Sequence, residues 1–106
     1  MTAQEVFWKG QSGRQYKYYV HDLDTRWKDA PGNYIFAKKS GQGWVAIYVG
    51  ETESLRDRIP NHEKWSCARR NGVTHIHAHV NNGGMAKRRE EEDDLIAAHD
   101  PPCNEE

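Results

Sequence analysis

Two pairs of short segments rich in aromatic and β-branched residues limit most strongly what this 106-residue chain can fold into. The segments are residues 5–9, 15–20, 33–38 and 44–49. Gly10 to Gly13 joins the first pair, and Ser40 to Gly43 joins the second. Such segments around a glycine-containing turn are typical of β-hairpins. We therefore predict two hairpins in the first half of the chain, separated by a loop or a short helix.

The second half alternates helical and extended patterns. Thr52 or Ser54 can cap a helix that runs to about residues 65–68, and Pro60 predicts a kink or an early break within it. Residues 73–80 alternate as a strand does, and residues 85–98 follow as a second helix. We expect an α+β fold, with a small antiparallel or mixed sheet of about three strands, flanking helices and an extra N-terminal hairpin.

Length and composition favour one domain over residues 1–106. No segment reaches the roughly 18–20 apolar residues of a membrane span, and the N-terminus lacks a signal-peptide pattern. We expect a cytoplasmic protein without a membrane partner, either monomer or dimer. Cys67 and Cys103 lack CxxC spacing. We expect both thiols to be reduced, and a single disulfide is the alternative.

The charge balance does not by itself indicate nucleic-acid binding. Lys and Arg number 15 and Asp and Glu 16, for a net charge of -1. A protein that binds DNA by neutralising phosphates is usually basic. Clustered cations are the candidate contacts: Arg56, Arg58, Lys64, Arg69 and Arg70, with a second run at residues 87–89. The alternative is a solvated surface of mixed charge.

The predicted last helix carries a carboxylate in an unusual position. Met85, Leu95 and Ile96 mark its apolar face, and Glu92 lies on that face, whereas the acids at positions 90, 91, 93 and 94 are expected in solvent. A carboxylate that faces a core costs free energy unless it is paired or binds a metal. Glu92 is therefore a candidate metal ligand, and an ion pair with Arg88 is the structural alternative.

Two further groups of residues suggest chemistry. Arg58 and His62 are four apart, at the border of the buried face of the predicted first helix, where an arginine can bind a phosphate in bidentate fashion. The alternative is a surface arginine and a histidine that lines the helix. His75, His77 and His79 share one strand face. They suggest a zinc-dependent hydrolase or, with fewer assumptions, an exposed histidine-rich sheet face.

Together these residues resemble the GIY-YIG nuclease family. The Gly-hydrophobic-Tyr motif corresponds to Gly32-Asn33-Tyr34, with Asn33 in place of an aliphatic residue, and the Tyr-Ile/Val-Gly motif to Tyr48-Val49-Gly50. In the same register follow Arg58, His62, Glu92 before an apolar pair, Pro101 and Asn104. The resemblance covers about residues 31–104. Residues 1–30 lie outside it and are expected to form an extra sheet edge or a dimer contact.

The resemblance implies an endonuclease that hydrolyses DNA, branched or damaged forms included, and leaves 5′-phosphate and 3′-hydroxyl ends. Glu92 would hold one divalent ion, Mg²⁺ or Mn²⁺, and Arg58 would neutralise charge on the phosphate. Either Tyr34 or Tyr48 would orient or deprotonate the attacking water.

The resemblance gives two further residues supporting roles. His62 would assist proton transfer or hold a tyrosine, and Asn104 would fix the C-terminal segment by hydrogen bonds. The main alternative is a catalytically inactive module of the same fold that binds nucleic acid or protein.

Overall fold

The computed structural model describes residues 4–105. In chain order its elements are β1 (Glu5–Lys9), β2 (Gln15–His21), β3 (Gly32–Ser40), β4 (Gly43–Thr52), α1 (Leu55–Arg58), α2 (Trp65–Arg70), β5 (His75–Val80), α3 (Met85–His99) and the 3₁₀ helix η1 (Pro102–Asn104). Within the described residues, no helix has the length and apolar character to cross a membrane.

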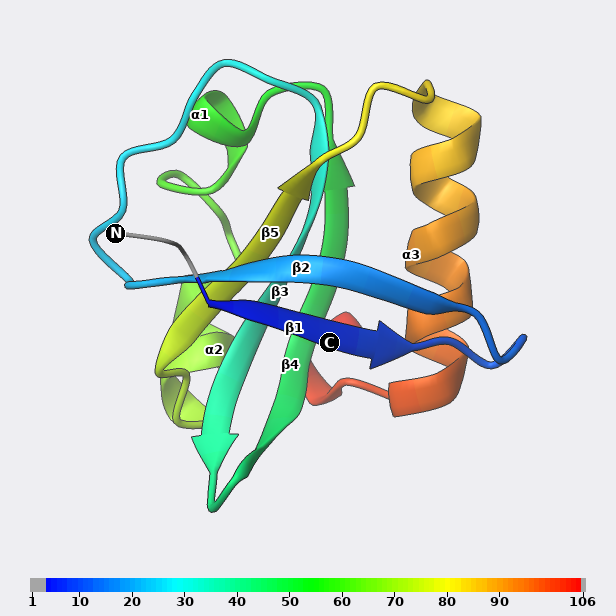
Figure 1. The fold of residues 1–106 in the computed structure, drawn as a ribbon. Helices are drawn as coiled ribbons and strands as arrows, with labels where there is room; N and C mark the ends of the chain where they lie inside the picture. The colour runs from blue at the N-terminus through cyan, green and yellow to red at the C-terminus, as the bar shows by residue number, and fades with distance from the viewer. Residues whose placement is uncertain (1–3, 106) are drawn as a thin grey trace.

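All strands of the sheet are antiparallel, in the order β1-β2-β5-β3-β4 (Figure 1). The α+β class and both predicted hairpins are confirmed, but the sheet has five strands instead of about three. The reason is β5, which pairs with β2 on one side and with β3 on the other. The N-terminal hairpin is therefore one edge of a continuous sheet. The pairing of β5 with β2 and β3 joins segments that are distant in the sequence, so local sequence patterns do not predict it.

The two faces of the sheet carry separate cores. The helix α3 covers one face, and α1 and α2 lie on the other (Figure 1). The core under α1 and α2 includes Tyr34, Phe36, Leu55, Ile59 and Ile76. The core under α3 includes Trp8, Tyr18, Ile35, Val49 and Leu95. Alternate residues of β3 thus face opposite cores, which explains why its first six residues are all buried.

The predicted break at Pro60 is confirmed. Ser54 caps α1 by accepting a hydrogen bond from the backbone N–H of Asp57 at 3.2 Å, but α1 ends at Arg58. The next helix begins only at Trp65. Arg58 and His62 therefore do not share a helix face as expected, because His62 lies in the turn that connects α1 to α2.

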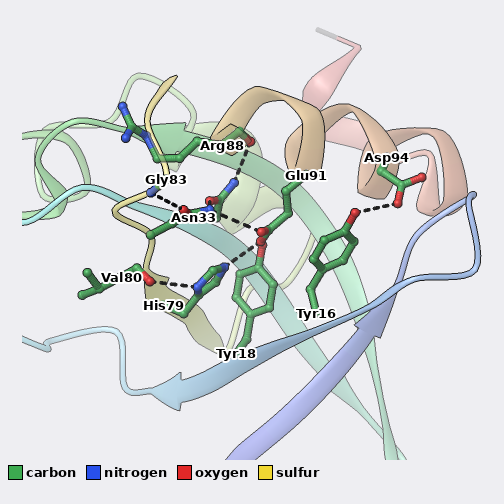
Figure 2. Close-up of polar contacts among 10 residues, drawn as sticks. Tyr16, Tyr18, Asn33, His79, Val80, Gly83, Arg88, Glu91 and Asp94 are labelled. Carbon is green, nitrogen blue, oxygen red and sulfur yellow. Dashed lines mark hydrogen bonds and ion pairs between the residues drawn. The ribbon is translucent and has the colours of Figure 1, made fainter. Parts of the chain in front are cut away.

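The buried face of α3 differs from the predicted one. Arg88, Glu91 and Leu95 are buried, whereas Met85 is 47% exposed. The Glu91 carboxylate accepts a hydrogen bond from the Tyr18 hydroxyl at 2.6 Å and lies 2.7 Å from His79 Nε2 (Figure 2). The prediction that Glu91 is solvated was wrong. The positions of apolar residues along α3 do not indicate that β2 and β5 supply polar partners for a buried carboxylate.

The neighbouring acids and bases of α3 are also paired with distant strands. Arg88 Nε donates to Glu51 at 2.9 Å, so the suggested pair between Arg88 and Glu92 is not formed. Asp94 was likewise expected in solvent, but it accepts hydrogen bonds from Tyr16 and Ser12. These contacts hold α3 against both sheet edges.

Asn33, the departure from the aliphatic residue of the family motif, is fully buried and helps to place α3. Its side-chain Nδ2 donates to the carbonyl oxygen of Arg88 at 2.9 Å, and its Oδ1 accepts from Asn81 Nδ2 at 2.9 Å (Figure 2). A buried amide with both ends bonded is stable in a core. Asn33 therefore fixes the first turns of α3 over β3.

The three histidines of β5 do not form an exposed face, so that expectation was wrong. His77 is fully buried, and its Nδ1 accepts a hydrogen bond from Trp8 Nε1 at 2.9 Å. His79 contacts Glu91, and His75 packs against Trp44 with ring centroids 5.1 Å apart. In the described part of the chain, no three His, Cys, Asp or Glu side chains converge as a metal site, so the zinc hypothesis gains no support.

The buried His77 makes stability sensitive to acid. Burial, followed by the nearby His75, lowers its pKa to about 4, compared with 6.5 for a free histidine. The unfolded chain therefore binds the additional proton first, and stability is lost as the pH falls from about 6.5 towards 4. We expect the urea midpoint to fall over this range, and less steeply in His77→Gln. His99→Gln, which removes an exposed histidine that does not contribute to the lowered pKa of His77, is the control, and equal slopes in all three proteins would contradict the assignment.

Cys67 and Cys103 form a disulfide, with an S–S distance of 2.10 Å. The expectation of two reduced thiols was therefore wrong. The two residues are 36 positions apart, and only the folded chain brings α2 and η1 together. The bond ties η1, which contains Asn104, to the core under α1 and α2.

Candidate active site

Tyr34 and Tyr48 lie on the face of the sheet that α1 and α2 cover. Tyr34 is in β3 and is 1% exposed, whereas Tyr48 is in the edge strand β4 and is half-buried. A register shift between Phe36 and Ala37 leaves Ile47 as an extra residue of β4. Such a bulge re-aims the side chains beside it. Ile47 and Tyr48 consequently both pack towards the same core, with the Tyr34 and Tyr48 ring centroids 6.2 Å apart.

Gly50 allows the two phenols to approach the end of β4. It pairs directly with Tyr34 across the strands. A Cβ atom at Gly50 would lie 2.6 Å from the Tyr34 hydroxyl oxygen and 2.9 Å from Cε2 of Tyr48. The Tyr34 ring therefore packs over the backbone of Gly50, and its hydroxyl lies over β4, the edge strand of the sheet.

We expect Gly50→Ala to displace both tyrosines. The overlap of the new methyl group with two rings should lower stability by about 1–3 kcal/mol. A displacement of about 1 Å should lower any phosphodiesterase activity roughly 100-fold. Gly43→Ala is the matched control, because it lies in the same strand and its Cβ would meet nothing closer than 3.8 Å. Urea unfolding and plasmid nicking measure the two effects, and a fully active Gly50→Ala protein would contradict this placement.

His62 holds the Tyr34 hydroxyl in a defined orientation. Its Nε2 lies 2.8 Å from the Tyr34 oxygen, and its Nδ1 accepts the backbone N–H of Lys64 at 3.0 Å. Because Nδ1 is an acceptor, the neutral ring carries its proton on Nε2 and donates it to Tyr34. Burial, and then the charge of Arg58, lowers the pKa of His62 to about 4, so the ring is neutral at pH 7. The O–H of Tyr34 therefore points away from His62.

Arg58 lies beside the tyrosines and is held by Glu63. Its Nη1 and Nη2 donate to the two carboxylate oxygens of Glu63 at 2.6 and 2.8 Å. The hydrogen bond from Arg58 is the main reason that the pKa of Glu63 falls to about 2. This contact uses two of the five N–H groups of the guanidinium. The side chain is 36% exposed, so its other donors remain accessible to a phosphate.

Glu92 lies within electrostatic reach of both phenols. Among residues 4–105, no hydrogen bond or ion pair is formed by its carboxylate, although the residue is half-buried. Burial, and then the charges of Glu51 and Asp93, raises its pKa to about 7. An unpaired carboxylate with additional negative charge beside it is the environment that a divalent cation would stabilise. A single carboxylate as protein ligand fits Mg²⁺ or Mn²⁺, which keep much of their hydration shell.

The electrostatic effects connect these side chains. Burial is the main cause of the raised pKa of both Tyr34 and Tyr48. The charge of Glu92 raises both pKa values further, and Arg58 lowers both. Both phenols are therefore neutral at pH 7 in the free protein, and the loss of a phenolic proton requires positive charge nearby. The structure thus places Tyr34, Tyr48 and His62 in contact, with Arg58 and Glu92 within electrostatic reach of both phenols.

Asn104 completes the edge of the site. Its Oδ1 accepts the backbone N–H of Val49 at 2.9 Å, and its Nδ2 donates to the Val49 carbonyl oxygen at 2.9 Å. These are the bonds that a neighbouring strand would make with β4. Asn104 therefore caps the exposed edge of β4 next to Tyr48, and the disulfide at Cys103 holds η1 there.

The candidate nucleic-acid contacts lie on and around α1 and α2 but are not equivalent. Arg56 pairs with Asp29 and Asp57. Arg69 lies over the Trp65 ring, and Arg70 Nη1 donates to Ser66 at 3.2 Å. The backbone of Lys64 bonds to His62. Arg58 is in electrostatic contact with both Tyr34 and Tyr48.

Sequence reasoning missed Glu63, which orients Arg58, and Glu51, which pairs with Arg88 and lies near Glu92. Glu51 directly follows the Tyr48-Val49-Gly50 motif, which could have drawn attention to it. No comparable signal marks Glu63. No protein-family model matches this chain, and a search of the curated proteins finds no match.

Proposed function

We propose that this protein is a divalent-metal-dependent endonuclease that hydrolyses DNA phosphodiester bonds to 5′-phosphate and 3′-hydroxyl ends. The observation that carries the proposal is that two phenols lie side by side with one guanidinium and one unpaired carboxylate within electrostatic reach of both. These groups can supply three functions that phosphodiester hydrolysis uses: neutralisation of charge, movement of a proton and binding of a cation.

The residues divide the chemistry between them. Arg58, oriented by Glu63, binds the non-bridging oxygens of the scissile phosphate with its remaining N–H donors and offsets the charge that develops there. Tyr34 accepts a hydrogen bond from His62 Nε2, so its own O–H is directed away from His62 towards the attacking water or the phosphate. His62 and Arg58 would stabilise a Tyr34 phenolate that forms when the phenolic proton is lost to solvent, and this phenolate would then accept a proton from the attacking water.

Glu92 is the residue that would hold Mg²⁺ or Mn²⁺. The chemistry that this ion supplies when bound is polarisation of the phosphoryl group and stabilisation of the leaving 3′ oxygen. Tyr48, half-buried at the edge, lies where it can orient the substrate or the water. Asn104 keeps the edge of β4 closed, which preserves the position of Tyr48.

A plasmid-nicking assay tests the proposal. Supercoiled DNA should become nicked with Mg²⁺ or Mn²⁺ and stay intact with a chelator, and the nicks should be sealed by a DNA ligase that requires 5′-phosphate and 3′-hydroxyl ends. A folded protein that binds DNA but nicks neither supercoiled nor branched DNA with either metal would contradict catalysis and favour a non-catalytic binding module.

A further inference from the structure

A groove of about 700 Å³ lies over β2 and β5, and none of the residues proposed for catalysis lines it. Tyr19 and Ala78 form its floor, and Trp27, Lys28 and Leu55 line its side. Nothing in the proposed mechanism uses this groove. Most of its lining belongs to the N-terminal region of the chain, which lies outside the family resemblance.

The charge of the lining differs from that of the whole protein. Lys17, Arg26 and Lys28 line the groove, and within the described residues no Asp or Glu does. The chain as a whole has a net charge of -1. The nearby Asp29 is paired with Arg56 at 3.3 Å. The groove is therefore a local concentration of positive charge on a protein that is acidic overall, which fits an anionic ligand.

Aromatic rings lie among these cations. Lys17 Nζ lies 5.8 Å from the centroid of the Tyr19 ring, and the rings of His21 and Trp27 are 4.8 Å apart. Both Tyr19 and Trp27 are only partly buried and both line the groove, so part of each side chain is accessible to a ligand there. Cations that follow a backbone, combined with rings on which bases stack, are how proteins bind single-stranded nucleic acid.

The strand register joins this groove to the candidate active site. Tyr19 pairs with Ala78, Ala78 with Tyr34, and Tyr34 with Gly50. Directly paired residues share one face of a sheet, and adjacent strands lie about 4.8 Å apart, so Tyr19 and Tyr34 are separated by roughly 10 Å along one row. A polynucleotide in the groove would thus lie on the same sheet face as the two phenols.

We propose that this groove binds an unpaired, single-stranded arm of the nucleic-acid substrate beside the bond that is cleaved. The inference rests on the proposed endonuclease function and names its substrate as a duplex with a single-stranded branch. Stacking on Tyr19 and Trp27 requires base faces that a continuous duplex conceals. Lys17 and Arg26 bind the phosphates of the arm.

Fluorescence anisotropy in a chelator tests binding without cleavage. The probes are a labelled oligothymidylate of about 15 nucleotides, a blunt duplex and the same duplex with a single-stranded arm. We expect the wild-type protein to bind the armed duplex more tightly than the blunt one. Tyr19→Val should weaken binding to the oligothymidylate about tenfold. The Lys17→Gln and Arg26→Gln variants should each reduce the slope of log affinity against log salt by about 0.7.

Lys39→Gln is the matched control, because it removes a cation that lies over Trp44 and does not line the groove. It should leave the discrimination between armed and blunt duplexes unchanged. If the groove variants bind as tightly as Lys39→Gln, or if the wild type binds both duplexes equally, the groove proposal is wrong. Nicking of plasmid DNA is measured separately. If the wild type nicks DNA but the groove variants bind as tightly as it does, only the groove proposal is wrong. If the wild type binds the armed duplex tightly but does not nick DNA, only the endonuclease proposal is wrong.

Discussion

Glu92→Gln should abolish metal-dependent nicking while leaving the fold intact. The substitution keeps the size of the side chain but removes the charge that would hold the cation, and the loss of several kcal/mol of transition-state stabilisation corresponds to at least about a 1,000-fold decrease in rate. Glu92→Ala should have the same effect on nicking. Single-turnover rates in Mg²⁺ and Mn²⁺ measure the loss.

Stability gives this prediction a second, independent readout. Because the Glu92 carboxylate is half-buried and unpaired, neutral glutamine should leave the far-UV spectrum unchanged and the melting temperature equal or higher. Glu90→Gln is the control, since Glu90 is exposed on the same helix, pairs with Arg14 and should be dispensable for activity. A Glu92→Ala protein with wild-type nicking would remove Glu92 from the mechanism.

Arg58→Ala should reduce turnover far more than DNA affinity. In the proposed mechanism the guanidinium neutralises charge that increases in the transition state, and comparable arginines contribute about 10³-fold or more to phosphoryl transfer. We expect a decrease of about 1,000-fold in the single-turnover rate and less than about tenfold in affinity for uncleaved DNA. Arg58→Lys should recover little activity, because an ammonium cannot replace the planar fork that Glu63 orients.

Arg56→Ala is the matched control for this experiment. Arg56 is exposed, lies two residues earlier on α1 and pairs with Asp29 and Asp57. Its loss should affect affinity slightly and turnover not at all. Equal decreases in affinity and turnover for Arg58→Ala would make Arg58 a binding residue alone.

Local sequence signals predicted the elements of the fold because turns and helix breaks depend on neighbouring residues. The glycine-containing turns gave both hairpins, and Pro60 gave the break between α1 and α2. The same local reasoning failed for α3. Glu91 and Arg88 are buried because Tyr18, His79 and Glu51 satisfy them, and these partners lie on three different strands.

Long-range pairing decided the features that local reasoning could not reach. The position of β5 between β2 and β3 turned two hairpins into one five-stranded sheet and placed Tyr19 in the same row as Tyr34. The same packing buried His77, which the alternating pattern had suggested was exposed, and brought Cys67 to Cys103.

The amino-acid sequence by itself determined which residues are candidates for the site, because the motifs around Tyr34, Tyr48, Arg58 and Glu92 depend on residue type and spacing. Only the tertiary structure decided how these groups interact. Three features depend on neighbours that folding brings near. They are the unpaired state of Glu92, the hydrogen bond from His62 to Tyr34 and the ion pair between Glu63 and Arg58. Burial and neighbouring charges then set the protonation of these side chains. In an extended chain the same side chains are solvated and far from one another.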